Sequence, residues 1–297
     1  MPHTFSLPRL DFSQLLPAVI TITQQVGEVL TIYYNQHLQS AIDIETKKDA
    51  SPVTAADIAA HDFIEAALLT LTPDIPVLSE ESADVSSRKD WQRFWLVDPL
   101  DGTREFIKKT GEFTVNIALV EAGQVLLGVI GVPLKQQVYA ASNNLGAHVD
   151  QPKQAYRVDE NGSQHQLLKR GIEIKHLNTA MSRSSSRPQY TEYQQQLTHT
   201  GFTFDTINAG SAYKFCLMVD GEIDLYPRLH PTSEWDTASG QCLLEVVGGA
   251  LVDLTGRPFK YNQRNRLLNG GFIAVIDRDL LPAVLPKAFE AEEHHFR

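Results

Sequence analysis

The chain has 297 residues, of which 42% are hydrophobic and 21% are charged. This ordinary globular composition excludes a fibrous or disordered chain, and the length suffices for one large domain or two packed halves. Acidic residues outnumber basic ones, 36 to 26, which gives a formal net charge of -10. A general nucleic-acid binder is therefore excluded, because the phosphate backbone would repel so acidic a chain.

The chain contains 2 cysteines, Cys216 and Cys242. Two are too few for a disulfide framework or a four-cysteine zinc site, which fits a reducing compartment. The first residues lack a basic start followed by an apolar core, and no apolar run approaches the roughly 18 residues that a membrane span needs. We therefore expect a soluble cytoplasmic protein without a signal peptide or an integral membrane segment.

Two helical patterns open the chain. Apolar residues at mixed three- and four-residue steps predict a helix over residues 12–38. A second helix is expected over residues 53–71, where Thr54 with Asp57 three residues later resembles a capping box at its start. The expected inner face of this second helix consists of Ile58, Phe63, Ala67, Leu68 and Leu71.

Short apolar runs then predict strands. The runs at residues 76–79 and 94–97 each end in acidic residues, as buried strands do where a functional site begins. Residues 113–120 and 124–132 predict a hairpin that turns at Glu121-Ala122-Gly123. A further strand is expected over residues 138–141.

The polar segment of residues 142–175 predicts loops and edge strands. We expect it to separate two halves, residues 1–176 and residues 177–297. Beyond it, patterns of helix and strand alternate. They predict helices at residues 191–198, 212–219 and 237–247 and strands at residues 202–207, 222–225, 250–254 and 272–276. The expected class is a mixed α/β protein, α+β in the first half and α/β in the second.

The sharpest chemical motif is Asp98-Pro-Leu-Asp-Gly-Thr103, directly after an apolar strand. Two carboxylates three residues apart can converge on one point, and oxygen ligands of this kind suit hard cations such as magnesium. Thr103 precedes a short predicted helix over residues 104–108, whose first amides could hold an anion. An ordinary turn uses the same residue types. Taken alone, the motif leaves a metal and phosphate site and a plain turn equally open.

Three further acidic positions each have a simple explanation in isolation. Glu80, in the run Ser79-Glu-Glu-Ser82, could lie on a solvated loop, and Asp236 could be the N-cap of the helix that follows it. Asp57 is accounted for by the capping box. All of them nevertheless lie at predicted element ends, where folds place functional groups. Unpaired carboxylates in one pocket would repel each other, so a cluster of them implies bound cations.

In this order, the acidic motifs resemble those of the inositol monophosphatase superfamily, which are magnesium-dependent, lithium-sensitive phosphatases. The resemblance extends to one branch, the CysQ-type 3'(2'),5'-bisphosphate nucleotidases. The motifs that carry it are SPVTAAD at residues 51–57, VLSEES at 77–82, DGTREFI at 101–107, GEFTVNIA at 111–118, KFC at 214–216 and LYPR at 225–228. The resemblance implies the layered αβαβα sandwich of sugar-phosphatase-like proteins.

The resemblance also assigns roles around a magnesium site. Its implied ligands, for two or three ions per site, are Glu80, Asp98, Asp101, Asp236 and the backbone carbonyl of Leu100. Thr103 would polarise the attacking water, and Asp57 would pair with Thr103 to raise its basicity. Glu80 would help to orient the same water. The chemistry is metal-assisted hydrolysis, without a covalent phosphoenzyme.

The implied substrate contacts lie on both sides of the metals. The amides of Gly102 and Thr103 would hold the scissile phosphate. The residues implied to bind the nucleotide are Ser182, Arg183, Ser211 and Lys214. Asp236 is implied both as a metal ligand and as a substrate contact. Arg183 and Lys214 are the basic groups expected near a second phosphate. A solvated arginine in a serine-rich loop and a helix lysine that faces water are equally open readings.

The expected function is hydrolysis of 3'-phosphoadenosine 5'-phosphate to AMP and phosphate, a step of sulfur metabolism. The sulfated precursor, 3'-phosphoadenosine 5'-phosphosulfate, is an expected second substrate. The nearest alternative is a phosphatase of the same superfamily that acts on inositol phosphates or another sugar phosphate. A remote one is a non-catalytic, metal-dependent binding protein. The sequence leaves open the oligomeric state and a peripheral association with the cytoplasmic face of the inner membrane.

Overall fold

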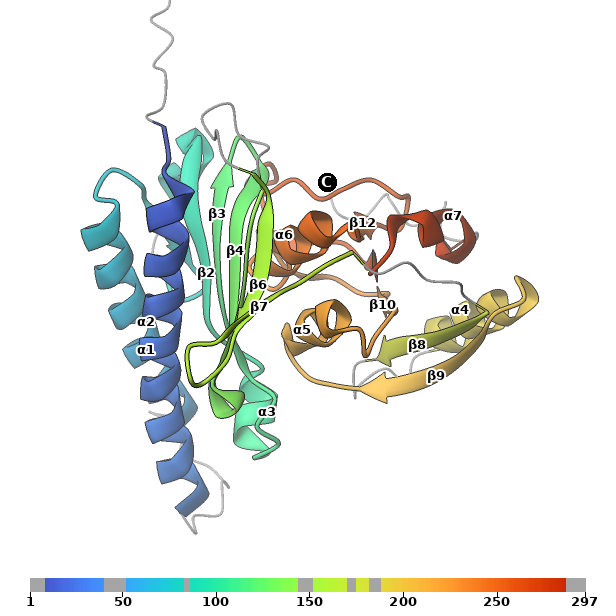
Figure 1. Cartoon of the computed structure of the whole chain (residues 1–297), viewed down its shortest axis with the longest axis horizontal. Coiled ribbons are helices and arrows are strands. Elements are labelled where there is room, and N and C mark those ends of the chain that lie inside the picture. Colours follow the sequence, from blue (N-terminus) through green and yellow to red (C-terminus); the bar gives the residue numbers. More distant parts are fainter. Residues whose placement is uncertain are drawn as a thin grey trace, which may run out of the picture.

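Five layers make up the structure, a computed structural model (Figure 1). It describes residues 9–39, 52–82, 86–143, 152–169, 175–181 and 188–286, apart from the side chains of residues 52–54. Two helices cover one face of a first sheet, two more lie between this sheet and a second one, and two cover the outer face of the second sheet. The order is αβαβα, which confirms the expected sandwich.

The first sheet has its strands in chain order from β1 to β7. They are β1 (Val77–Ser79), β2 (Arg93–Asp101), β3 (Thr114–Glu121), β4 (Gln124–Val132), β5 (Gln137–Ser142), β6 (Gln154–Val158) and β7 (Gln164–Gln166). β1 and β2 are parallel, and the other pairs are antiparallel. The predicted hairpin is confirmed as β3–β4. Its turn uses positive φ at Ala122 (49°) and Gly123 (77°), which suits the right-handed twist of the strands.

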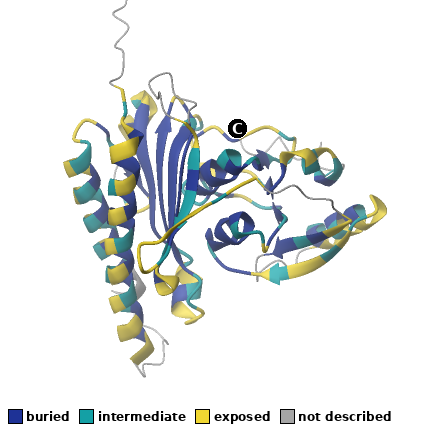
Figure 2. Cartoon of the chain, viewed as in Figure 1, coloured by how far each residue is buried: buried dark blue, intermediate teal, exposed yellow. Residues whose placement is uncertain are grey.

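Helices α1 (Phe12–Gln39) and α2 (Pro52–Leu71) cover one face of this sheet. Side chains on β2 alternate between the two faces, as a strand requires. Trp95 and Val97 pack under α1 and α2, whereas Phe94 and Leu96 face the layer between the sheets. Both faces are therefore apolar, and the central strands are buried throughout their length (Figure 2).

The buried face of α2 differs in part from the expected one. The side chains that are 0% exposed are Ala56, Ala60, Ile64 and Leu68, and they recur every four residues. Ile58, expected inside, is 47% exposed, so that prediction is wrong. Phe63, Ala67 and Leu71 pack partly buried against the same core. Small alanines let α2 approach its neighbours closely, which places the bulkier side chains at the margin or outside.

α2 also begins earlier than the capping pattern indicates. It begins at Pro52, two residues before Thr54. Proline is favoured in the first turn because its missing N–H has no helical partner there. The prediction that Thr54 caps the helix is therefore wrong. Asp57 consequently loses its capping explanation and lies on the second turn.

The sequence analysis found no apolar run of membrane-spanning length, yet an 18-residue stretch of α1 is apolar enough by composition, with a mean hydropathy of 1.4. Length and composition alone do not make it a membrane span. Half of that stretch is buried within the fold. Phe12, Leu16, Val26 and Leu30 are 0% exposed and belong to the core under the first sheet. A core helix of a globular domain explains this hydropathy.

The second sheet has the strand order β12-β14-β10-β8-β9. Its strands are β8 (His176–Met181), β9 (Thr203–Asn208), β10 (Leu225–Arg228), β12 (Ala250–Asp253) and β14 (Phe272–Val275). The sequence analysis did not predict β8, and the strand expected at residues 222–225 begins only at Leu225. A separate small pair is formed by β11 (Thr232–Ser233) and β13 (Leu268–Asn269).

The remaining helices fill the layers around the second sheet. The inner layer holds α5 (Tyr213–Asp220) and α6 (Ala238–Val247), whose apolar side chains join the core between the sheets. The outer face carries α4 (Pro188–His199), with η3 (Arg278–Leu280) and α7 (Leu281–Val284) beside it. α5 and α6 therefore lie in the layer between the two sheets. The polar end of β2 faces the same layer.

Candidate active site

The site begins at an irregularity in β2. Asp98 pairs with Asn116 on β3, and Asp101 pairs with Thr114. β2 thus advances three residues where β3 advances two, which is the extra residue of a β-bulge. In a regular strand, residues three apart point to opposite faces. The bulge instead turns both carboxylates to the face between the sheets. The proline turn expected here is a bulge within a continuous strand.

Asp98 is 1% exposed, and its Oδ1 accepts a hydrogen bond from the amide of Leu100 at 3.1 Å. This bond stabilises the bulge from within. The backbone of the neighbouring β1 turn joins the same place, because the amide of Glu80 donates to the carbonyl of Val97 at 3.1 Å. Glu80 therefore begins beside Asp98, although the sequence separates them by an entire loop and a strand.

Asp101 is held by groups from two further elements. Its Oδ2 accepts from the amide of Ala212, just before α5, at 2.5 Å. Asn116 Nδ2 and Thr114 Oγ1 lie 3.3 and 3.4 Å from the same oxygen. These bonds leave the other carboxylate oxygen of Asp101 for a different partner.

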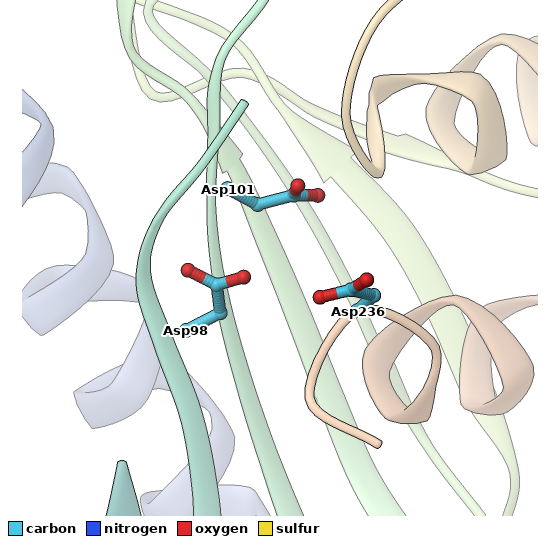
Figure 3. Close-up of side chains that lie close together, drawn as sticks. All are labelled: Asp98, Asp101 and Asp236. Atoms are coloured by element: carbon cyan, nitrogen blue, oxygen red, sulfur yellow. The ribbon is translucent and has the colours of Figure 1, made fainter. Parts of the chain in front are cut away.

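Asp236 completes the cluster from the second half of the chain. It lies before α6, and Thr232 donates a hydrogen bond to its Oδ2. One carboxylate oxygen from each of Asp98, Asp101 and Asp236 lies within 4.8 Å of the others. Figure 3 shows the three side chains pointing toward one another, two from β2 and one from the turn before α6.

The electrostatics of the cluster are those of crowded like charges. Desolvation, followed by repulsion from Asp101 and Glu80, raises the pKa of Asp98 well above its usual range. Desolvation and Asp101 raise the pKa of Asp236 from 3.8 to about 6. A carboxylate that resists ionisation in this way gains most from a nearby cation.

Glu80 and Asp57 extend the acidic region outward. Glu80 is an exposed residue, yet desolvation of its carboxyl, with repulsion from Asp236 and Asp101, raises its pKa from 4.5 to about 7, and a hydrogen bond with Asp98 opposes this shift. Desolvation, Glu81 and Glu80 raise the pKa of Asp57 from 3.8 to about 7. Asp57 is therefore close enough to the acidic turn after β1 for the charges of Glu80 and Glu81 to act on it.

The predicted phosphate-holding residues lie beside the acids. Gly102 adopts φ 94° and precedes α3 (Thr103–Ile107), whose first residue, Thr103, is exposed. A Cβ on Gly102 would lie 3.1 Å from both the Ser211 Cβ and the Glu112 carbonyl oxygen. Positive φ and this close approach both require glycine. The structure therefore brings Gly102 and Ser211 together.

For Lys214 the structure excludes one of the two interpretations that the sequence left open. Lys214 is 3% exposed, and its ammonium group donates to the carbonyls of Ser211 at 2.7 Å and Ala209 at 3.1 Å. The same group lies 5.0 Å from the centre of the Tyr226 ring. These contacts tie down the loop that carries Ser211. Solvent exposure of Lys214 is excluded, and its contact with a phosphate stays a prediction.

One functional candidate was missed by the sequence analysis. Arg228, at the end of β10, lines a cavity of 20 Å³ together with Asp101, Ser211 and Asp236. This volume suits a single water or ion. Among the described residues, Arg228 Nε is buried without a hydrogen-bond partner. The LYPR motif was the available signal, but only the sheet order places its arginine beside the acids.

Two predicted residues cannot be located. Ser182 and Arg183 lie outside the described residues. Leu100 is 1% exposed within the bulge, where its amide supports Asp98. The roles proposed for these three residues stay predictions.

The donor set fits a hard divalent cation. It consists of carboxylate oxygens within 4.8 Å of one another, with no sulfur or imidazole among them. Oxygen donors of this kind select magnesium, calcium or manganese over zinc or copper. Burial, followed by repulsion between the acids, raises the pKa values of Asp98 and Asp236, so that ionising both costs free energy. A bound cation would offset this cost.

Comparison with known proteins agrees with this architecture. The model of the inositol monophosphatase family matches residues 11–287. Relatives named 3'(2'),5'-bisphosphate nucleotidase CysQ from Escherichia coli and Salmonella typhimurium are each 41% identical, over 87% and 88% of this chain and 98% and 100% of theirs. The crystal structure of CysQ from Bacteroides thetaiotaomicron superposes with a TM-score of 0.74 at 33% identity, covering 89% of this chain and 97% of that one.

These findings define the class of protein to which the chain belongs. A layered αβαβα fold with an acidic cluster between its sheets is the architecture of sugar-phosphatase-like proteins. The chain belongs to the inositol monophosphatase family.

Proposed function

We propose that the chain is a magnesium-dependent phosphatase that hydrolyses 3'-phosphoadenosine 5'-phosphate to AMP and phosphate. The observation that carries this proposal is the convergence of Asp98, Asp101 and Asp236 within 4.8 Å, in a chain 41% identical to two 3'(2'),5'-bisphosphate nucleotidases. The second expected substrate is 3'-phosphoadenosine 5'-phosphosulfate, which would yield adenosine 5'-phosphosulfate.

The chain's part in metal binding is to hold ligands from both halves in one place. The proposed ligands are Glu80, Asp98, Asp101, Asp236 and the carbonyl of Leu100, for two or three ions. When bound, the cations supply Lewis acidity toward the phosphoryl oxygens and lower the pKa of water. Competition by lithium at this site is part of the proposal.

Water activation is assigned to the contact region of α2 and α3. Thr103 is an exposed residue at the start of α3, and α2, which carries Asp57, contacts α3. In the proposed reaction Thr103 polarises the attacking water, and Asp57 pairs with Thr103 to raise its basicity. Glu80 helps to orient the same water. A pKa of about 7 suits Asp57 to proton exchange near neutral pH.

The scissile phosphate is assigned to the amides of Gly102 and Thr103. The left-handed turn at Gly102 (φ 94°) directs the backbone away from the strand, where the absence of a Cβ allows a close approach. The 211–212 loop closes the opposite side, because Ala212 donates to Asp101. The phosphate and the acids would therefore share one compact site.

The second phosphate of the nucleotide is assigned to basic residues of the second half. Arg183 and Lys214 are the basic groups expected there, whereas Arg228 lines a cavity of 20 Å³ that has room for an ion but not for a phosphate. A planar guanidinium, as in Arg183, suits a phosphate, which accepts two hydrogen bonds from it. Ser182 and Ser211 complete the proposed nucleotide side. An inositol monophosphate lacks the second phosphate that this arrangement would bind.

A direct test compares phosphate release from 3'-phosphoadenosine 5'-phosphate and from inositol 1-phosphate, side by side, with magnesium and with or without lithium. The proposal predicts fast release from the nucleotide and inhibition by lithium. Preference for the inositol ester would keep the metal site and overturn the substrate. Absence of turnover on both would favour a binding protein. Arg183→Met serves as a matched variant, expected to raise KM for the bisphosphate much more than KM for a nucleotide that carries the 3'-phosphate alone.

The location proposed for the enzyme is the cytoplasm. Cys216 and Cys242 are free and buried, as suits a reducing compartment, and the proposed reaction uses neither. Cell fractionation tests this location. Recovery in the membrane pellet at low salt, with release at high salt, would identify peripheral association with the cytoplasmic face of the inner membrane.

A further inference from the structure

A buried carboxylate, that of Glu234, lies two residues before Asp236 in the sequence. Glu234 is 0% exposed. Its Oε1 accepts from Arg264 Nη2 at 2.8 Å, and its Oε2 accepts from the amide of Asn262 at 2.6 Å. Both oxygens are therefore held by a loop far along the chain. Because Arg264 neutralises Glu234, this carboxylate adds no net charge to the site.

The residue on the other side of Asp236 is tied to the same loop. Thr237 Oγ1 accepts from Asn269 Nδ2 at 2.7 Å and lies 3.3 Å from the hydroxyl of Tyr261. It also donates to the carbonyl of Glu234 at 3.0 Å, which closes the turn across Asp236. Asp236 thus stands between two neighbours that are both fixed to residues 261–269.

That loop is itself anchored to the first half of the chain. Arg88 lies in η1 (Ser86–Asp90), which precedes β2, and it is 5% exposed. Its guanidinium donates to Asn262 Oδ1 and to the carbonyl of Asn265 at 2.7 Å, and Asn262 Nδ2 donates back to the carbonyl of Arg88. Asn262 holds φ 58°, a conformation that asparagine tolerates better than most residues. The loop is therefore a fixed anchor between the two halves.

This anchor addresses a problem that the acidic cluster creates. Asp98 and Asp101 belong to β2, whereas Asp236 comes from the other half of the chain, and their like charges repel. A turn held only by its own helix could move away from β2. The bonds of Glu234 oppose that movement because they connect the turn to a loop that is bonded to η1. Partners behind metal ligands commonly set ligand orientation in this way.

We propose that Glu234 is a positioning residue for the cation site, which, through Arg264 and Asn262, holds Asp236 in register with Asp98 and Asp101. The inference rests on the proposed function only in taking the acidic cluster as a cation site. It assigns Glu234 no contact with the cation or the substrate. Loss of Glu234 should therefore weaken cation binding first and affect turnover through it.

The test titrates Mn²⁺ into the metal-free full-length chain and measures bound ion by electron paramagnetic resonance, for wild type, Glu234→Ala and Glu234→Gln. We expect Glu234→Ala to raise the Kd for Mn²⁺ by about 10–100-fold. Glu234→Gln should raise it less, because an amide oxygen still accepts from Asn262. Raising magnesium should restore turnover of Glu234→Gln, since its kcat changes less than its half-saturating magnesium concentration.

A matched control separates positioning from general loss of stability. Glu121, 8% exposed, pairs with Arg93 at the opposite end of β2, so Glu121→Gln also breaks a buried ion pair. We expect Glu121→Gln to lower the Tm while its Kd for Mn²⁺ stays at the wild-type value. Where Glu234→Ala does not fold, Glu234→Gln decides the question.

The outcomes are distinct. Wild-type Kd values in the folded Glu234 variants would overturn the proposal, and so would an equal weakening in Glu121→Gln. Failure of the wild type itself to bind Mn²⁺ would overturn the cation site and with it the proposed function.

Discussion

The two ends of β2 treat buried charge in opposite ways. At its first residue, Arg93 donates through Nε to Glu121 Oε2 at 2.6 Å, and both side chains are buried. At its other end, the carboxylates of Asp98, Asp101 and Asp236 converge, and within the described residues the small cavity beside them is lined by one basic side chain, Arg228. One strand pair thus carries a neutralised ion pair and a cluster of like charges. At the structural end of β2, the chain itself supplies the counter-charge, because Arg93 pairs with Glu121.

The acidic end of β2 differs from an ion pair in the pKa values of its carboxyl groups. Asp98, Glu80 and Asp57 all have raised pKa values, with desolvation as the largest cause in each. A carboxylate that is paired with a cationic side chain shows the reverse, because the partner lowers its pKa. Asp159 is such a case here, since Arg157 lowers its pKa. Together with the convergence of Asp98, Asp101 and Asp236 within 4.8 Å, this difference supports a cation from outside the chain at the acidic end.

The largest effect is expected from Asp98→Asn, which removes charge from the acidic end. Turnover should fall by at least about 10²–10³-fold, the scale for loss of a preorganised electrostatic partner. The Tm of the metal-free protein should stay equal or rise, because repulsion is relieved and an asparagine oxygen can still accept from Leu100. Phosphate release and thermal unfolding measure both. An active variant would refute the assignment of Asp98 to the metal.

Thr103→Ala tests the proposed role of the Thr103 hydroxyl in activating water without changing the charge of the acidic cluster. It leaves all carboxylates in place, so cation affinity should be unchanged. Turnover should fall by about 10²-fold or more, with little change in KM, because the lost hydroxyl acts on the attacking water. Steady-state kinetics with the nucleotide check this expectation. Wild-type kcat would remove Thr103 from the reaction.

The other end of β2 should respond in the opposite manner. Glu121→Gln leaves Arg93 buried without its charge partner, which we expect to cost about 3–5 kcal/mol of unfolding free energy. Urea denaturation measures this loss. Turnover per folded molecule at saturating magnesium should match the wild type. A loss of turnover without a loss of stability would break the contrast between the two ends.

The smallest effect is a pH dependence of the metal-free protein. Asp57 and Glu80 have folded-state pKa values of about 7, above their ordinary 3.8 and 4.5. The folded state then binds more protons than the unfolded state, so stability should fall as pH rises from about 4 to about 7. Excess magnesium should reverse this trend, because the cation binds the ionised form. Thermal unfolding at several pH values, with and without magnesium, checks both signs.

The sequence predicted the elements that depend on local pattern. The hairpin of β3 and β4 and the helices α1 and α6 lie close to their expected positions, because their apolar periodicity and turn residues are local signals. The exposure of Ile58 was not predictable in the same way. The buried face of α2 is decided by how closely Ala56 and Ala60 let it pack, which is a property of the neighbouring helix and sheet.

The acids of the site were predictable as motifs, but their arrangement was not. The motif at residues 98–103 reads as a turn, and only pairing with β3 shows the bulge that points Asp98 and Asp101 to one face. Arg228 and Glu234 escaped prediction for the same reason. Their roles depend on strand order and on a loop many residues away, and single residues in a sequence carry no signal of either.

Calorimetric titration of magnesium into the metal-free protein at pH 6 to 7, in buffers of different ionisation enthalpy, tests the central claim most directly. If the acidic end of β2 is completed by a cation, magnesium should bind with release of protons, because carboxylates with raised pKa values must ionise. Asp98→Asn should lose most of that binding. Absence of binding to the wild type, or binding that Asp98→Asn leaves unchanged, would contradict the account.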